Sequence, residues 1–135
     1  MKKIISLTVL SLLSLLCCIS AYAALPEDTI IPLWENVVAV DNDFYFSGSN
    51  SYVDVSVTAN SGTTSMVVAA KVYKQTASGS WSLVKSKTGT SSTFSVSFEV
   101  PFEAVKGTYY KSVLSITSYR GGVRYSDSHT AYATY

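Results

Sequence analysis

Cysteine is almost absent from this sequence, and the few cysteines are adjacent to each other. Only two of the 135 residues are cysteine, and both belong to an apolar run near the N-terminus, at Cys17 and Cys18. If that run is removed as a leader, the remaining chain has no thiol that could form a disulfide, bind a metal or act as a nucleophile. A hydrophobic core alone must then stabilise the fold.

Charge and histidine are also scarce. Without Lys2 and Lys3, eight Lys and Arg remain against nine Asp and Glu, a formal charge of −1. This balance disfavours a nucleic acid or an anionic membrane surface as a partner. The single histidine, His129, excludes a multi-histidine metal centre, and the chain has no glycine-rich phosphate-binding loop with a lysine. We therefore expect no cofactor.

Residues 1–23 have the organisation of a secretory signal peptide. Lys2 and Lys3 precede the apolar run, which ends just before Ala21-Tyr22-Ala23. Small residues at both ends of that tripeptide suit a signal peptidase, so we expect cleavage after Ala23 and then an extended lead-in at 24–33. An uncleaved membrane anchor is the less favoured alternative. The sequence predicts a protein that is secreted or associated with the cell envelope, without stable membrane insertion of its mature domain.

Turn-forming clusters of Gly, Asn, Asp and Ser divide residues 34–135 into short segments. Their spacing of roughly 8–12 residues is typical of an all-β sandwich or barrel. One of the clusters is Asp41-Asn42-Asp43, where we expect a turn. The sequence predicts one all-β domain, an antiparallel β-sandwich of about seven strands. The expected strands are 34–40, 52–58, 64–75, 81–87, 93–100, 108–120 and 123–135.

The alternation of apolar and polar residues predicts which side chains are buried. Valine alternates with polar residues over 52–58, which places its valines on one face. The segment 93–100 repeats the pattern and ends at Pro101, so we expect Phe94, Val96, Phe98 and Val100 to point inward. The segment 64–75 alternates less, which is typical of a central strand buried on both faces or of a bulged strand.

Gly121-Gly122 joins the last two expected strands. A glycine pair suits a two-residue hairpin loop that needs positive φ at both positions. If Arg120 pairs with Val123, the core face contains Tyr110, Leu114, Ile116, Val123, Tyr125, Ala131 and Ala133. Asp127 and His129 also fall on that face, which predicts a bulge there or a register that fails.

The segment Lys106-Gly107-Thr108-Tyr109-Tyr110 resembles the tyrosine corner of immunoglobulin-like and fibronectin-type sandwiches. In that motif a Tyr hydroxyl bonds back to the preceding loop, and Tyr110 is the better candidate here. The opening Pro32-Leu33-Trp34-Glu35-Asn36 and the late Gly-x-Tyr-Tyr resemble small secreted proteins of Gram-positive bacteria with no assigned function. The resemblance implies an immunoglobulin-like sandwich.

Candidates for catalysis and metal binding are few. Asp127 could orient His129 from the same strand face, but Ser128 points to the other face, so ordinary hydrogen bonds are the favoured interpretation. Asp41 and Asp43 offer hard oxygen ligands for calcium, although the glycine and glutamate of an EF-hand loop are missing. We treat calcium at Asp41 and Asp43 as a weak alternative. The sequence therefore predicts a protein that is not an enzyme.

Aromatic residues are the remaining signal for function. In the predicted register, Tyr109, Tyr119, Arg124 and Tyr132 lie on the outward face of the last hairpin, where exposed rings and a cation could form a flat recognition surface. The competing interpretation is that these rings only strengthen the sheet. We expect a secreted, non-catalytic binding or structural module of the cell exterior, with an extracellular protein or glycan as partner. The alternative function is a small secreted toxin or antimicrobial effector.

Overall fold

The computed structural model describes residues 35–135, all of which belong to one compact unit, Pro32–Tyr135. The predicted signal peptide, its cleavage after Ala23 and the lead-in at 24–33 lie outside the described residues, and so does Trp34. The described part is almost entirely β-structure, with a single turn of 3-10 helix, η1, at Gly48–Asn50.

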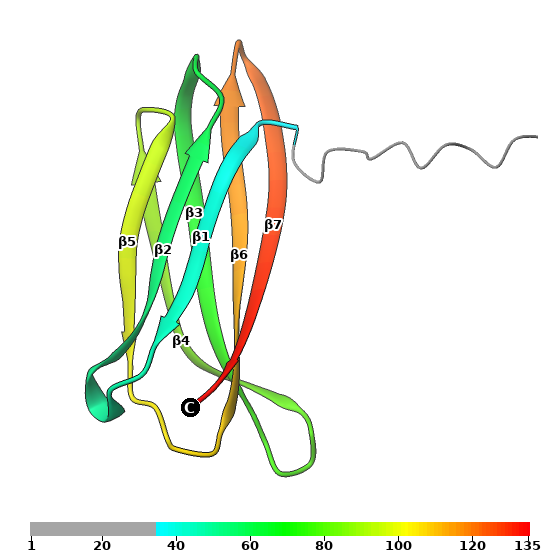
Figure 1. Ribbon diagram of the computed structural model, residues 1–135. Helices are drawn as coiled ribbons and strands as arrows, with labels where there is room; N and C mark the ends of the chain where they lie inside the picture. The colour runs from blue at the N-terminus through cyan, green and yellow to red at the C-terminus, as the bar shows by residue number, and fades with distance from the viewer. Residues whose placement is uncertain (1–34) are drawn as a thin grey trace, which may run out of the picture. The chain divides into compact units, whose positions relative to one another are not determined.

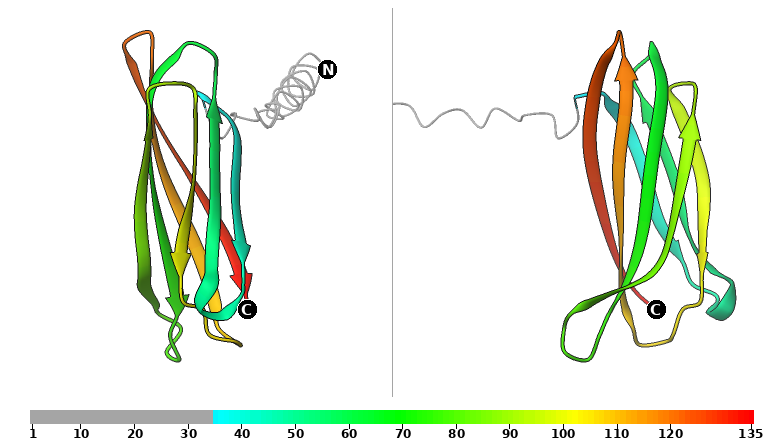
Figure 2. Two further views of the ribbon diagram at one scale, coloured as in Figure 1. Left: turned by 90° about the vertical axis from the view of Figure 1, so that its left-hand side faces the viewer. Right: turned by 180° about the vertical axis from the view of Figure 1, so that it is seen from behind.

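Two antiparallel sheets pack face to face, which confirms the predicted all-β sandwich (Figures 1 and 2). One sheet has the strand order β1-β2-β5 and the other has the order β4-β3-β6-β7. The strands of the described residues are β1 (Val37–Tyr45), β2 (Ser51–Ala59), β3 (Thr63–Gln75), β4 (Trp81–Ser91), β5 (Ser95–Phe102), β6 (Tyr109–Arg120) and β7 (Val123–Thr134).

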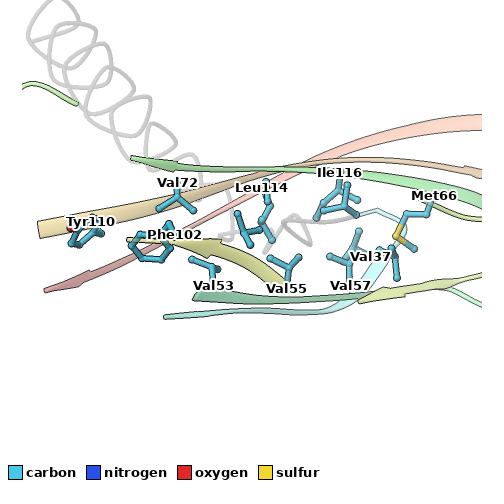
Figure 3. Close-up of a cluster of buried hydrophobic side chains, with 14 of the residues drawn as sticks. Val37, Val53, Val55, Val57, Met66, Val72, Phe102, Tyr110, Leu114 and Ile116 are labelled. Atoms are coloured by element: carbon cyan, nitrogen blue, oxygen red, sulfur yellow. The ribbon is translucent and has the colours of Figure 1, made fainter. Parts of the chain in front are cut away.

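The core fills the space between the sheets with aliphatic side chains. Val53, Val55 and Val57 of β2 are fully buried, as the alternation in this segment predicts. Across the core, Leu114 and Ile116 of β6 face them (Figure 3). Strands that alternate in this way bury one face and expose the other, so each sheet also has an outer face that meets solvent.

The structure corrects the predictions for β1 and β5. Asp41-Asn42-Asp43 lies inside β1 rather than in a turn, because Asn42 points inward and pairs with Val55 while the two aspartates point outward. Phe94 is 48% exposed and not in the core, since the chain bends at Ser92–Phe94 before β5 begins. Pro101 does not end the strand, which runs to Phe102; β5 is an edge strand, where proline is tolerated.

Strand β3 is not buried on both faces. Met66, Val68, Ala70 and Val72 point into the core, whereas Val67 is 40% exposed on the other side. The pairing of β3 with β6 skips Thr64, between Thr63 and Ser65, so the alternative prediction of a bulged strand is correct at the start of β3.

The β6–β7 hairpin has the predicted register, with Arg120 paired to Val123 and Tyr109 to Thr134. Gly121 and Gly122 both have positive φ, 57° and 78°, as the two-residue turn requires. The pairing continues past Asp127 and His129 without a shift, so the predicted bulge is wrong. Both residues point toward the core side but are only half-buried, because β7 is the edge of its sheet.

Burial on the core side of this hairpin follows the prediction only in part. Tyr110, Leu114 and Ile116 are buried as expected. Val123 is 52% exposed beside the turn, so the prediction that it belongs to the core is wrong. Tyr125, Ala131 and Ala133 are half-buried on the edge strand β7.

Tyr110 ties the end of β6 to the loop that precedes it. Its hydroxyl accepts a hydrogen bond from the backbone N–H of Val105 at 2.9 Å, while its ring is buried against Phe102 at a centroid distance of 5.4 Å. This is the backbone contact that a tyrosine corner makes.

We expect Tyr110→Phe to lower the free energy of unfolding by about 0.5–1.5 kcal/mol, the usual net contribution of one hydrogen bond. The ring stays in the core, so only the hydroxyl contact is lost. Urea denaturation measures the change. Tyr109→Phe is the matched control, because no hydrogen bond of the Tyr109 hydroxyl is present among the described residues; an equal loss in both variants would contradict the assignment.

Candidate functional site

The outer face of the four-stranded sheet is formed by the side chains of β4, β3, β6 and β7 that point away from the core. On β6 these are the odd-numbered residues from Tyr109 to Tyr119, and on β7 the even-numbered ones from Arg124 to Thr134. Strand pairing aligns Tyr73 of β3 with Lys111 of β6, and Lys111 with Tyr132 of β7. Residues from three strands therefore lie in one row across this face.

An aromatic cluster occupies one end of the outer face, next to the β3–β4 turn and the C-terminus (Figure 1). Tyr109 and Tyr132 stack with ring centroids 5.9 Å apart and planes 16° apart. Trp81, at the start of β4, approaches Tyr109 at 5.7 Å and Tyr132 at 6.1 Å. Tyr109 is 39% exposed and Tyr132 is 56% exposed, so the rings meet solvent as well as each other.

Lys111 places a positive charge inside the aromatic cluster. Its Nζ lies 4.5 Å from the centroid of the Trp81 ring and 5.2 Å from that of Tyr73. Both distances are within the range of a cation–π interaction. We define the aromatic cluster as Tyr73, Trp81, Tyr109, Lys111 and Tyr132.

The structure divides the four site residues that the sequence predicts into two groups. Tyr109 and Tyr132 come together in the aromatic cluster. Tyr119 and Arg124 are paired with each other at the opposite end of the hairpin, beside the Gly121-Gly122 turn. Ten residues of strand separate Tyr109 from Tyr119, about 33 Å at roughly 3.3 Å per residue. A small ligand cannot contact both groups.

Sequence reasoning missed Trp81, Tyr73 and Lys111 as site residues. The β3–β4 turn around Gly79 pairs Gln75 with Trp81 and so places the indole on the outer face. The turn was visible in the sequence, but the register shift near Tyr73 was not, and the shift decides which β4 residues share a face with β3. Lys111 was visible as a neighbour of Tyr132, and only the structure shows its contact with Trp81.

Asp41 and Asp43, the weak calcium alternative, lie on the outer face of the other sheet. Asp43 pairs with Asp54 of β2, which pairs in turn with Glu99 of β5. Within residues 35–135, no group of three or more His, Cys, Asp or Glu residues has an arrangement that could hold a metal ion. The calcium alternative receives no further support from this geometry.

A polar seam runs along the open side of the sandwich, between the edge strands β1 and β7. The Asn42 Nδ2 donates to the carbonyl of Ser112 at 3.3 Å and lies 3.3 Å from His129 Nδ1. Further along, the buried Asn36 Nδ2 donates to the hydroxyls of Thr63 and Ser118. Ser128 is exposed on the opposite face from His129, as predicted.

Asp127, which lies near this seam on β7, has a shifted pKa. Burial removes water from its carboxyl group and raises its pKa above the ordinary value of 3.8, and the nearby negative charge of Glu35 raises it further. The Asp127 Oδ2 atom is buried, and none of the described residues donates a hydrogen bond to it. A buried carboxylate oxygen without a donor disfavours the ionised form.

The raised pKa predicts a pH dependence of stability. Below pH 3.8 the Asp127 carboxyl group is protonated in both the folded and the unfolded state. Above the raised pKa it is ionised in both states, and the ionised form costs more free energy in the folded state because the group is partly buried there. Stability should therefore fall as the pH rises through this window. We expect Asp127→Asn to remove this part of the fall and to stabilise the protein at pH 7 relative to wild type.

Thermal denaturation at pH 3.5 and pH 7 measures the effect. Glu103→Gln removes an exposed carboxylate and controls for the change in net charge. If Asp127→Asn lowers the melting temperature at pH 7, the ionised carboxylate stabilises the fold and the assignment is wrong.

No protein-family model, curated protein or solved structure matches this chain. Across the part that the structure describes, no helix is long and apolar enough to cross a membrane. The same part has no pocket.

Proposed function

We propose that this chain is a secreted, non-catalytic binding module of the cell exterior, and that the aromatic cluster is its binding surface. The carrying observation is the group of three mutually contacting rings, Trp81, Tyr109 and Tyr132, left partly exposed on an open sheet face. Exposed aromatic rings offer a large contact area at low entropic cost. None of the three rings belongs to the buried core cluster.

The setting of the aromatic cluster supports a glycan as its ligand. With no pocket in the described residues, a ligand must lie along the surface, as a polysaccharide chain does. Beyond the cluster the outer face is lined by hydroxyl groups, in the pairs Ser115/Ser128 and Thr117/Ser126 and at Thr130, which pairs with Val113. Protein–protein interfaces are depleted in serine and lysine, whereas rings can stack on the C–H faces of sugars and hydroxyls can pair with theirs.

The immunoglobulin-like relationship belongs to the same proposal. The strand order resembles that of a constant-type immunoglobulin sandwich in which the fourth strand has moved from the first sheet to the second. The Tyr110 hydrogen bond to Val105 also supports the relationship. Export rests on the N-terminal sequence, with its expected cleavage after Ala23.

The direct test is an array of purified extracellular polysaccharides and peptidoglycan, probed with the purified protein and with the double variant Tyr109→Ser/Tyr132→Ser. We expect binding by wild type and a loss of about tenfold or more in affinity for the double variant. The matched control is Tyr45→Ser, which removes a 49% exposed ring stacked on Tyr52 at 5.0 Å, on the other sheet.

The two interpretations of the rings predict different results. If the double variant melts at a lower temperature and keeps its affinity, the rings only strengthen the sheet. If Tyr45→Ser loses affinity to the same extent, binding is not specific to the outer face of the four-stranded sheet. Either result would contradict the proposed site.

A further inference from the structure

Charge is segregated between the two outer faces of the sandwich. Among residues 35–135, the outer face of β4-β3-β6-β7 has Lys71, Lys111 and Arg124 and no aspartate or glutamate. The outer face of β1-β2-β5 has the opposite character, with Asp41, Asp43, Asp54 and Glu99 and no lysine or arginine. The charges of the basic face and the acidic face largely cancel in the near-neutral net charge of the chain, so the net charge reveals neither face.

The cations of the outer face are placed beside its aromatic rings. Lys111 lies among the rings of the aromatic cluster, and Lys71 is two residues from Tyr73 on the same face of β3. Arg124 pairs with Tyr119 at the far end. No salt bridge to any of these three cations is present among the described residues, so their charges are available to a ligand.

The aromatic cluster and the Tyr119/Arg124 pair lie at opposite ends of one strip of the outer face, along the β6–β7 hairpin, which we call the lane. The residues between them on β6 and β7 are small and mostly hydroxylated, so no bulky side chain interrupts the surface. The lane is about 33 Å long at roughly 3.3 Å per strand residue, which is room for several sugar units. A polymer can contact both ends at once.

We infer that the ligand of this face is an acidic polysaccharide, a sugar polymer with negatively charged groups along its chain. The inference rests on the proposed function and specifies the ligand class of the same site. Rings bind the sugar faces, hydroxyls pair with the sugar hydroxyls, and the three cations attract the anionic groups. The four carboxylates of the other sheet repel the same polymer, so it binds one face and not the other.

The probes are polygalacturonate, whose sugars each have a carboxylate, and the same polymer after reduction of its carboxyl groups. Dextran sulphate and dextran form a second pair, in which sulphate replaces carboxylate. We expect each acidic polymer to bind about tenfold or more tightly than its neutral counterpart at low salt, and the difference to shrink as salt screens the charges.

The matched variants separate charge from packing. Lys71→Gln/Lys111→Gln is expected to weaken binding of the acidic polymers by about tenfold, and Arg124→Gln tests the far end without touching the aromatic cluster. Lys85→Gln is the control, because Lys85 is exposed on β4 but pairs with Val72, on the opposite side from the outer face. A melting curve of each variant shows whether it still folds.

The outcomes distinguish this inference from the proposed function. Equal binding of acidic and neutral polymers would overturn the inference and leave the proposed function standing. Binding of no polysaccharide at all would overturn both. Tighter binding of poly(U) than of any glycan would identify a polynucleotide as the occupant and overturn the inference.

A second copy of this chain is the remaining occupant to test, since its acidic face complements this one. Sedimentation of the protein alone at low salt detects such association. Oligomers that dissolve in salt or with Lys71→Gln/Lys111→Gln would overturn the inference, and a monomer under these conditions supports it.

Discussion

Leu114→Ala is expected to lower the free energy of unfolding by about 2–5 kcal/mol, the usual cost of truncating a fully buried leucine. Leu114 is 0% exposed and lies in the middle of β6, where it faces Val55 and its neighbours across the core (Figure 3). The described residues include no cysteine, so no disulfide restrains their unfolded state. A cavity at this position therefore weakens the main source of stability.

Urea denaturation measures this loss, and Leu83→Ala is its matched control. Leu83 is 54% exposed on β4, so the same truncation there should change stability by no more than about 0.5 kcal/mol. A similar loss in both variants would mean that the core between the sheets is not what stabilises the fold.

Trp81→Ala is expected to have the largest effect on binding. Trp81 contacts Tyr109, Tyr132 and Lys111, so its removal takes away one ring and releases two others from their packing. Loss of an aromatic residue at the centre of a binding surface commonly costs about 2 kcal/mol, or roughly 30-fold in affinity. Affinity for the polysaccharide that binds wild type best is the quantity to measure.

The fold of Trp81→Ala is checked by its melting temperature. Trp81 is half-buried at the edge of the sheet, and the buried core does not include it. We therefore expect a folded variant that binds poorly. An affinity within about threefold of wild type would remove Trp81 from the site, and the aromatic cluster could no longer be its centre.

Local pattern predicts much of this fold, because some of its determinants are local. Alternating valines place β2 correctly, and Gly121-Gly122 sets the register of the last hairpin to the residue. The hydrogen bond between the Tyr110 hydroxyl and the preceding loop follows from a short motif around Tyr110. In these segments, strand alternation and turn geometry are sufficient to fix which face of the sheet each residue lies on, although not how deeply it is buried.

The errors occur where tertiary context decides. Asn42 is a common turn former, but here it extends β1 and uses its amide to bond Ser112 across the open side of the sandwich. Asp127 and His129 fit the core side without a bulge because β7 is an edge strand, where polar groups stay half-exposed. A local sequence pattern shows neither that a strand lies at the edge of its sheet nor which residue of a distant strand a side chain will bond.

The candidate site was predicted in part for the same reason. Tyr109 and Tyr132 belong to one hairpin, and its turn was sufficient to bring them together. Trp81 and Tyr73 come from another hairpin, and their approach depends on how β3 pairs with β6. The separation of charge between the faces required the strand order of both sheets, because composition gives only its average.

Backbone amide chemical shifts would show whether a ligand binds the outer face of the four-stranded sheet. Isotope-labelled protein is titrated with polygalacturonate, and the shifted amides are mapped onto the strands. We expect the shifts to be concentrated at the Trp81 end of β4, β6 and β7 and to extend along the hairpin toward Arg124. Shifts centred on Asp43, Asp54 and Glu99 of the other sheet would contradict it.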